Sequence, residues 1–410
     1  MRILIVASNI SARMGGEAVL PYHYIRELSA KGIEIHAITH ARVREEVTSG
    51  PLADCATFHF VEDSFLEKFF FRLGEIAPAA LRDAVFNSLV AFVTLARLGR
   101  KTKILAREHE VDLVHQPTPV SPLFPSFTYS LGVPVIIGPM NGAMSFPPGF
   151  RQAYSKGGDA LVNFGRVFGD LVNRFIPGKR KAQKVLVSNQ RTQDGLPQGI
   201  PAERIATLAE NGVDLSLWTP QERVRPADPL YIFVGRLILL KGVDLMIEAF
   251  ARADENAQLL IIGDGPEKAN LEALASQRAP GRVQFSGFLP QTEIRDRLSK
   301  ATALVFPSLR DCGGAVILEA FACGVPAIAS DWGGPQDYIT PETGVLVEPR
   351  EREQFIDGLA RAMIKLGDDP EVALSMGEAA RAYVEANFSW AAKADKMIAI
   401  YKDVIAAAES

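Results

Sequence analysis

The most informative stretch of this chain is Phe306-Pro-Ser-Leu-Arg-Asp-Cys-Gly-Gly-Ala-Val-Ile-Leu-Glu-Ala-Phe-Ala-Cys-Gly-Val-Pro326. An apolar run of strand length ends in it, and two glycines then lead into an apolar helical run. Asp311 precedes the glycines, and Glu319 lies eight positions later. Glycines let a ligand approach the backbone, free amides at a helix start attract an anion, and carboxylates accept hydrogen bonds from hydroxyls. The stretch therefore predicts a site for a phosphate and sugar hydroxyls, as in a nucleotide sugar.

Outward from this stretch, short β-rich apolar runs alternate with helical patterns, which predicts an α/β fold with two doubly wound parallel sheets. In the first half the expected strands are Ile3–Ala7, Ile33–Ile38, Leu113–His115, Val133–Ile137, Val185–Ser188 and Ile205–Leu208. In the second half they are Leu230–Val234, Gln258–Ile262, Val283–Phe285, Ala303–Phe306, Ala327–Ala329 and Gly344–Val347. Ligands bind at the carboxyl ends of such strands, and two facing domains enclose a cleft.

A chain of 410 residues is too long for one ordinary core. The segment from Asn211 to Pro229 is rich in proline and polar residues, and it is the predicted linker. We expect an acceptor domain over 1–208, a donor domain over 209–389, and a C-terminal helix over 390–410 that can cross back to the first domain.

Composition and charge limit the class of protein. Of the residues, 48% are hydrophobic and 22% are charged, and three cysteines without paired spacing predict a reducing, cytoplasmic setting. The net charge of −4 is uneven, because residues 1–206 hold 24 Lys and Arg against 18 Asp and Glu. The remainder holds 20 against 30. Either this difference in charge is neutral drift in composition between the two domains, or the first domain faces an anionic surface or acceptor.

Membrane contact is a second open question. The chain begins with a short strand-like run rather than a signal peptide, and no long uncharged apolar stretch predicts a transmembrane span. Two segments, Phe65–Lys103 and Met144–Lys184, combine aromatic with basic residues. Either could lie on a membrane as an amphipathic surface, at the inner face of the cytoplasmic membrane, or pack against the protein.

Several residues lie where a strand gives way to a helix or loop. Gly15 and Gly16 follow the first strand and can admit a phosphate, although such a pair is often only a turn. Gly235-Arg236 and Lys241 follow the first strand of the second half, where guanidinium and ammonium groups can bind one diphosphate. The alternative for these cations is a solvated loop.

Three further positions complete the candidate set. His115 ends a predicted strand and could bond a reacting sugar or serve the structure alone. Gly287, Phe288 and Leu289 could frame a nucleotide base, whereas Gly263-Asp-Gly-Pro266 is interpreted as an architectural turn. No histidine or cysteine spacing is typical of a metal site, so no metal is expected.

In this order the motifs resemble those of the retaining glycosyltransferases of family 4, which have the two-Rossmann GT-B architecture. The resemblance runs nearly end to end and rests on Gly15-Gly16, Asn211-Gly-Val-Asp214, Gly235-Arg236, Lys241-Gly242, Gly263-Asp-Gly-Pro266, Gly287-Phe-Leu-Pro290, Asp311 to Glu319, Gly333-Gly-Pro335, Thr343-Gly-Val-Leu-Val347 and Phe388-Ser-Trp390. No single motif is specific, but the ordered set is.

The resemblance implies a role for each matching residue. Arg236 and Lys241 would hold the donor diphosphate and stabilise the leaving group, with Gly16 closing over it from the other domain. Glu319 would bind the ribose hydroxyls, and His115 would lie near the reaction centre. Asp311 would read the hexose hydroxyls, and backbone amides would help hold phosphate, from Cys312, Gly313, Gly314 and Ala315.

The family usually carries a glutamate and a glycine-aromatic-glycine run where this chain has Asp311-Cys-Gly-Gly314. The shorter carboxylate leaves the donor hexose open. Gly138-Pro-Met-Asn-Gly142 and Pro147-Pro-Gly-Phe150 resemble members that act on polysaccharide or lipid-linked acceptors.

The expected reaction is transfer of a hexosyl group from a UDP- or GDP-linked sugar, with retention and without a metal or other cofactor. No nucleic-acid partner is expected. Two alternatives stay open: a nucleotide-sugar epimerase or hydrolase of the same architecture, and a non-catalytic nucleotide-sugar-binding protein.

Overall fold

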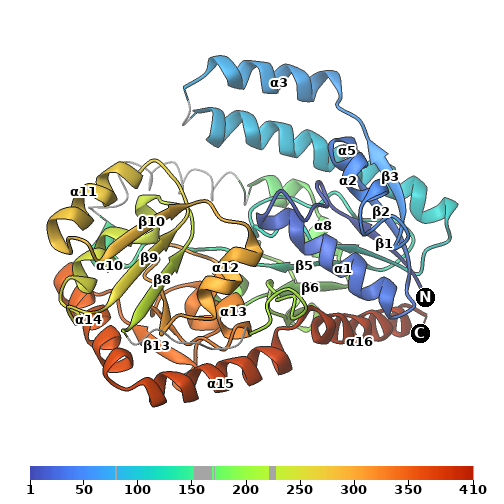
Figure 1. Ribbon diagram of the computed structural model, residues 1–410. Helices are drawn as coiled ribbons and strands as arrows, with labels where there is room; N and C mark the ends of the chain where they lie inside the picture. Colours follow the sequence, from blue (N-terminus) through green and yellow to red (C-terminus); the bar gives the residue numbers. More distant parts are fainter. Residues whose placement is uncertain (79–80, 152–168, 170, 221–227, 410) are drawn as a thin grey trace. The chain divides into compact units, whose positions relative to one another are not determined.

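The computed structural model describes residues 1–78, 81–151, 169, 171–220 and 228–409, which form two compact units (Figure 1). The first comprises 1–143, the described part of 160–210, and 393–409. The second comprises 144–151 and the described part of 211–392. Much of the predicted Met144–Lys184 segment and part of the predicted linker lie outside the described residues.

The first unit is built on a seven-stranded parallel sheet with the order β3-β2-β1-β4-β5-β6-β7. Its strands are β1 (Arg2–Val6), β2 (Glu34–His40), β3 (Thr57–Val61), β4 (Leu113–Gln116), β5 (Val135–Met140), β6 (Lys184–Val187) and β7 (Ile205–Thr207). The central strands are apolar and buried on both faces, as parallel sheets covered by helices require. The strand order reverses between β1 and β4, which are neighbours in the sheet.

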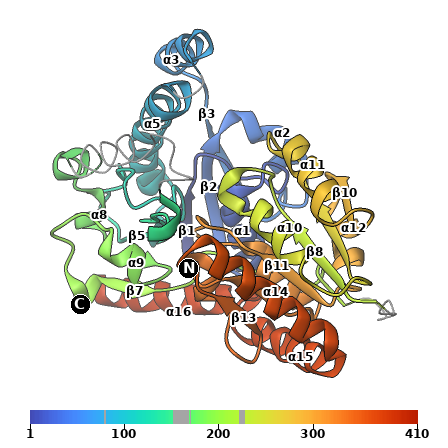
Figure 2. The same cartoon turned by 90° about the vertical axis from the view of Figure 1, so that its left-hand side faces the viewer.

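Helices connect these strands. They are η1 (Gly16–Ala18), α1 (Val19–Ala30), η2 (Ala41–Val43), α2 (Arg44–Ser49), α3 (Phe65–Ile76), η3 (Arg82–Phe86), α5 (Asn87–Glu108), α8 (Gly178–Lys181), α9 (Gln190–Asp194) and η5 (Ala202–Arg204). Helix α1 buries Tyr24, Ile25 and Leu28, which share one face at helical spacing. Helix α3 lies against α5 and farther from the sheet than α5 does (Figures 1 and 2).

The second unit has a six-stranded parallel sheet with the order β10-β9-β8-β11-β12-β13. Its strands are β8 (Leu230–Val234), β9 (Gln258–Ile262), β10 (Val283–Gly287), β11 (Ala303–Phe306), β12 (Ala327–Ser330) and β13 (Gly344–Val347). Its helices are η4 (Pro148–Phe150), η6 (Leu239–Lys241), α10 (Val243–Phe250), α11 (Lys268–Arg278), α12 (Gln291–Leu298), α13 (Ala315–Ala322), η7 (Gly334–Asp337), α14 (Arg352–Asp368) and α15 (Pro370–Asn387). The order reverses between β8 and β11.

Two segments depart from a simple division of the chain into halves. Residues 144–151 belong to the second unit, where Phe150 is fully buried against Phe355 at 5.9 Å between ring centroids. Helix α16 (Trp390–Glu409) begins in the second unit and belongs to the first from Lys393 onward.

Each strand that the sequence predicts is present, with ends shifted by a few residues. The local sequence pattern does not predict β3, a short edge strand whose residues are mostly only half-buried. Its sequence, Thr-Phe-His-Phe-Val, pairs with β2 along one side only, so it lacks the long apolar run of a central strand.

Candidate functional site

The carboxyl ends of β8 and β11 meet where the strand order of the second sheet reverses. Ligands of open parallel sheets bind at such a point, because the loops there diverge to opposite sides. The loops following these strands pack together, since Leu309 N–H donates to the Leu240 carbonyl at 2.9 Å. Gly242 has φ +62°, and a side chain there would place its Cβ 2.5 Å from the Pro307 carbonyl oxygen. The close approach of the two loops therefore requires glycine at this position.

Lys241 and Asp311 form an ion pair across this junction. Their side chains are 21% and 16% exposed, and the Lys241 ammonium also lies 5.0 Å from the centre of the Phe306 ring. The second oxygen of Asp311 accepts a hydrogen bond from the Gly313 amide at 3.2 Å. Asp311 thus fixes both the ammonium group and the glycine loop before α13. Its role as a direct reader of hexose hydroxyls stays a prediction.

Arg236 lies on the same loop as Lys241, just after Gly235 at the end of β8. Its side chain is exposed, and it forms no ion pair with any residue that the structure describes. The guanidinium group is therefore available to an anionic ligand. An exposed arginine beside a lysine already held in position is well suited to the oxygens of a diphosphate.

Helix α13 begins directly after Gly314, which has no side chain to cap the first amides. Four residues into this apolar helix, Glu319 is half-buried, and burial raises the pKa of its carboxyl group to about 7. Within the described parts of the chain, no side-chain hydrogen bond or ion pair engages this carboxylate. A half-buried carboxylate without a protein partner is suited to accept hydrogen bonds from a ligand.

The neighbouring loops hold this region in place. Gly334 N–H donates to the Asp311 carbonyl at 2.8 Å, so the loop after β12 supports the loop carrying Cys312 and Gly313. Leu237 N–H donates to the Asp264 carbonyl at 2.9 Å, which ties the β8 and β9 loops together. The Gly263-to-Pro266 turn is thus a connection between loops, in line with its architectural interpretation.

Phe288 follows β10 at the same edge of the sheet and is 84% exposed. Its neighbour Leu289 is half-buried, and Gly263 N–H donates to the Gly287 carbonyl at 2.9 Å. An exposed aromatic ring on an anchored loop can stack on a flat ligand. Its assignment to a nucleotide base remains a prediction.

In the first unit the corresponding reversal lies between β1 and β4. Gly15 and Gly16 have φ +66° and +55°, are exposed, and face open space where a Cβ would stand. The Glu17 carboxylate accepts a hydrogen bond from Val120 N–H at 3.2 Å, which joins the loops after β1 and β4. This glycine loop therefore has room for a ligand beside it.

His115 lies near the end of β4, as the sequence predicts, and its side chain points into the first unit. Its side chain is fully buried, with Nε2 2.7 Å from the Gly138 carbonyl oxygen and Nδ1 2.7 Å from the Tyr401 hydroxyl. The carbonyl can only accept, so Nε2 carries the proton and Nδ1 accepts from Tyr401. Burial lowers the pKa of His115 to about 4. Both ring nitrogens are therefore engaged within the unit, which fits the structural role that the sequence leaves open for His115.

Several side chains that contact these residues or their loops are not evident from the sequence. Tyr401 and Lys393 come from α16 at the end of the chain, and the Lys393 ammonium donates to the Glu210 carbonyl. In the second unit, Trp332 donates to the Ser145 carbonyl at 2.9 Å, and the Arg310 guanidinium lies 5.5 Å from the Phe146 ring centre. These contacts join residues far apart in the chain, and no local pattern signals them.

Residues 217–383 match the family model of the glycosyl transferases group 1. This match includes the loops that carry Arg236, Lys241, Asp311 and Glu319. Over 256 residues the chain is 32% identical to the GDP-mannose-dependent monoacylated alpha-(1-6)-phosphatidylinositol monomannoside mannosyltransferase of Corynebacterium glutamicum. That alignment covers 60% of this chain and 63% of the relative, so the chain spans less than two thirds of that protein.

Solved structures resemble the chain over almost its whole length. The sucrose-phosphate synthase of Thermosynechococcus elongatus has a TM-score of 0.70 at 22% identity and covers 99% of both chains. The Anabaena protein HepE, crystallised with UDP, has a TM-score of 0.68 at 17% identity and covers 98% of this chain and 100% of its own. These likenesses confirm the predicted fold class of two parallel α/β units of the GT-B kind.

Proposed function

We propose that this protein is a retaining glycosyltransferase of the family 4 type, which transfers a hexosyl group from a UDP- or GDP-linked sugar to a hydroxyl acceptor. The observation that carries the proposal is the charge arrangement at the β8–β11 reversal. There Lys241 is held by Asp311, while Arg236 and the Glu319 carboxylate have no ion-pair partner among the described residues. The matching family model covers the same region, and the proteins that the chain resembles include a GDP-mannose-dependent enzyme and a UDP-bound protein.

The diphosphate is the group that these cations recognise. As the bond between the hexose and the diphosphate breaks, negative charge grows on the leaving nucleoside diphosphate. Arg236, Lys241 and the uncapped amides at the start of α13 offset that charge, so they stabilise the transition state more than the bound donor. These groups make a metal ion unnecessary for departure of the diphosphate.

Glu319 binds the ribose. In its ionised form it accepts hydrogen bonds from the two ribose hydroxyls. These hydroxyls take the place of the water molecules that partial burial keeps from the carboxylate. Phe288 stacks on the base. Asp311 acts chiefly by positioning Lys241 and the Gly313 amide, and the free lone pairs of its carboxylate remain available to a hexose hydroxyl.

Retention follows from attack by the acceptor on the face from which the diphosphate leaves. None of the proposed site residues is an evident covalent nucleophile, so we favour this route over a covalent sugar intermediate. The acceptor is a glycan or a lipid-linked hydroxyl, as in polysaccharide biosynthesis. His115 supports the first unit and takes no part in the transfer.

We further propose that the first unit contacts an anionic membrane through α3. Of the eighteen exposed large hydrophobic side chains among the described residues, nine lie between positions 65 and 89. They are Phe65, Leu66, Phe69, Phe71, Leu73, Ile76, Leu81, Val85 and Leu89. Lys68 and Arg72 are exposed on the same helix, which gives the apolar surface basic flanks. No helix within the described ranges is long and apolar enough to span a bilayer.

The opposite face of α3 is anchored to α5. Glu67 is buried and accepts hydrogen bonds from Thr94 at 2.5 Å and from Arg97 at 2.7 Å. Ser64 completes a capping box with the same glutamate. The helix is thus held with its apolar residues outward, and this orientation supports membrane contact over burial in the core.

Vesicle sedimentation tests the membrane contact. We expect the protein to sediment with vesicles of phosphatidylglycerol and phosphatidylcholine but much less with phosphatidylcholine alone. The variant Phe65→Ser/Leu66→Ser/Ile76→Ser should lose most of this binding, whereas Leu374→Ser, an exposed leucine on α15, should keep it. Equal sedimentation of both variants would contradict the contact.

The transferase proposal is tested by a melting-temperature panel of UDP-, GDP- and ADP-linked hexoses, because a donor that binds the folded state raises the melting temperature. The stabilising donor, labelled in its sugar, is then incubated with lipid extract and glycan acceptors. We expect label in an acceptor product whose new bond has the anomeric configuration of the donor.

The same assay separates the alternatives. Turnover of the donor at an equal rate without acceptor would indicate an epimerase or hydrolase. Donor binding without product for any acceptor would indicate a non-catalytic binding protein.

A further inference from the structure

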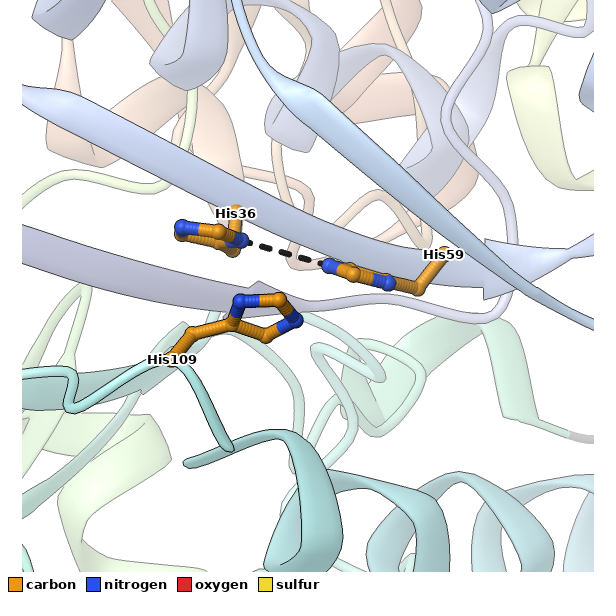
Figure 3. A group of neighbouring side chains, drawn as sticks. All are labelled: His36, His59 and His109. Atoms are coloured by element: carbon orange, nitrogen blue, oxygen red, sulfur yellow. Dashed lines mark hydrogen bonds between the residues drawn. The ribbon is translucent and has the colours of Figure 1, made fainter. Parts of the chain in front are cut away.

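Half of the six histidines in this chain converge at one place in the first unit. His36 lies on β2, His59 on the neighbouring edge strand β3, and His109 directly after the last residue of α5 (Figure 3). One ring nitrogen from each lies within 4.8 Å of the other two. This cluster has no part in the proposed transfer reaction.

The spacing of the nitrogens matches a metal site closely for one pair. His36 Nδ1 and His59 Nε2 are hydrogen-bonded at 3.2 Å (Figure 3), a contact that a bound metal ion would replace. In a tetrahedral zinc site with Zn–N bonds of 2.0–2.1 Å, two nitrogen ligands lie about 3.3 Å apart. The third nitrogen, at up to 4.8 Å, has to close by about 1.5 Å to complete such a site.

The third ring does not come from the sheet. His109 is half-buried and follows the end of a helix rather than lying within one. Its ring stacks on His36 with centroids 4.3 Å apart and lies 4.9 Å from His59. Rotation about its side-chain bonds can therefore turn a lone pair toward the other two nitrogens without moving the sheet.

The surroundings provide outer support for such a site. His36 Nε2, the nitrogen away from His59, faces the Glu34 carboxylate at 3.6 Å. A carboxylate behind a metal-bound histidine orients the ring and raises its basicity. Arg2 holds Glu34 at 2.6 Å and also donates to the His109 carbonyl at 2.7 Å, so one side chain contacts both the carboxylate behind His36 and the backbone of His109.

We propose that His36, His59 and His109 bind one divalent transition-metal ion, with zinc as the reference ion and a water molecule in the fourth position. Imidazole ligands suit zinc, copper and nickel rather than magnesium or calcium. The ion would tie the edge strand β3 to β2 and to the end of α5. His36 lies near the amino-terminal end of β2, whereas Gly15 and Gly16 follow the carboxyl end of β1, so the site serves stability of the first unit and not transfer.

The test uses the full chain without a histidine tag, freed of metal by a chelator. Zinc is titrated by calorimetry, and cobalt is titrated with detection of its visible absorption. We expect one ion per chain, a higher melting temperature with zinc, and the intense absorption of tetrahedral cobalt. His36→Gln, His59→Gln and His109→Gln should each weaken binding at least tenfold, whereas His23→Gln should leave it unchanged.

Two results would overturn the proposal. One is zinc binding of equal strength in the unaltered protein and the three cluster variants. The other is a cobalt spectrum of the unaltered protein with only the weak bands of the hydrated ion. The cobalt spectrum decides the matter even where a buried variant such as His36→Gln fails to fold.

Discussion

The two parallel sheets share a topology but differ in what they present at the point where strand order reverses. In the first unit, His115 at the end of β4 has both ring nitrogens bonded, to Gly138 and Tyr401, and is fully buried. In the second, Arg236 after β8 is exposed, and burial raises the pKa of Glu319 beyond β11. The topology thus places both loops where ligands bind in such sheets. The histidine of the first unit is already bonded to the protein, whereas the charged side chains of the second unit can still bond a ligand.

Removing the Lys241 side chain should have the largest effect, and that effect is on the rate of transfer. Lys241→Ala removes the ammonium that Asp311 holds at the reversal, so we expect kcat/KM for transfer to fall at least about hundredfold. Steady-state kinetics with labelled donor provide the measurement. Lys268→Ala is the matched control, because the ammonium of this lysine lies 3.8 Å from the Asp264 carboxylate and outside the proposed site. The transfer rate of this variant should stay near normal. A normal transfer rate in the Lys241→Ala variant would contradict a role for Lys241 in stabilising the departing diphosphate.

Removing the Tyr401 hydroxyl tests the other half of the comparison. Tyr401→Phe leaves the buried Nδ1 of His115 without a donor, so the free energy of unfolding should fall by about 1–3 kcal/mol. Denaturant unfolding measures this loss. Donor affinity should not change. A weaker donor affinity without a loss of stability would indicate that His115 takes part in donor binding.

The pKa of Glu319 predicts a smaller effect on donor binding. Its folded value of about 7 exceeds the usual 4.5, so the neutral form stabilises the free protein, and this stabilisation is lost as pH rises from 4.5 through 7. Ribose hydroxyls that donate to the ionised form reverse this preference. Donor affinity should therefore fall about tenfold from pH 8 to pH 6.

Calorimetry with the intact nucleotide sugar measures this dependence, because its diphosphate diester does not titrate in the range. Glu319→Gln should bind with an affinity that does not vary between pH 6 and pH 8. The same pH profile in Glu319→Gln and in the unaltered protein would remove Glu319 from the ribose site.

Much of the fold could be predicted because the central strands and their helices follow local patterns. The run from Ala303 to Pro326 also predicts Asp311 before a helix start and Glu319 after it, and the structure has both there. Arg236 is exposed on its loop, and its binding to a diphosphate stays a prediction. The resemblance to the GT-B fold rests on motifs such as Gly15-Gly16. Both glycines have positive φ angles, which favour glycine over other residues.

Other features depend on contacts between distant residues, which one sequence does not display. His115 lies at the end of a strand as expected, but its burial depends on Tyr401, which follows it by 286 positions. The ion pair between Lys241 and Asp311 joins residues that are 70 positions apart in the chain. The histidine cluster joins positions 36, 59 and 109, a spacing that matches no local metal motif.

The central claim is that the loops after β8 and β11 hold the diphosphate of a nucleotide sugar. Hydrogen–deuterium exchange of the full chain, with and without the donor that raises its melting temperature, tests this most directly. Bound donor should slow exchange at the amides of 235–242 and 312–316. Unchanged exchange at both loops, with a donor known to be bound, would contradict it.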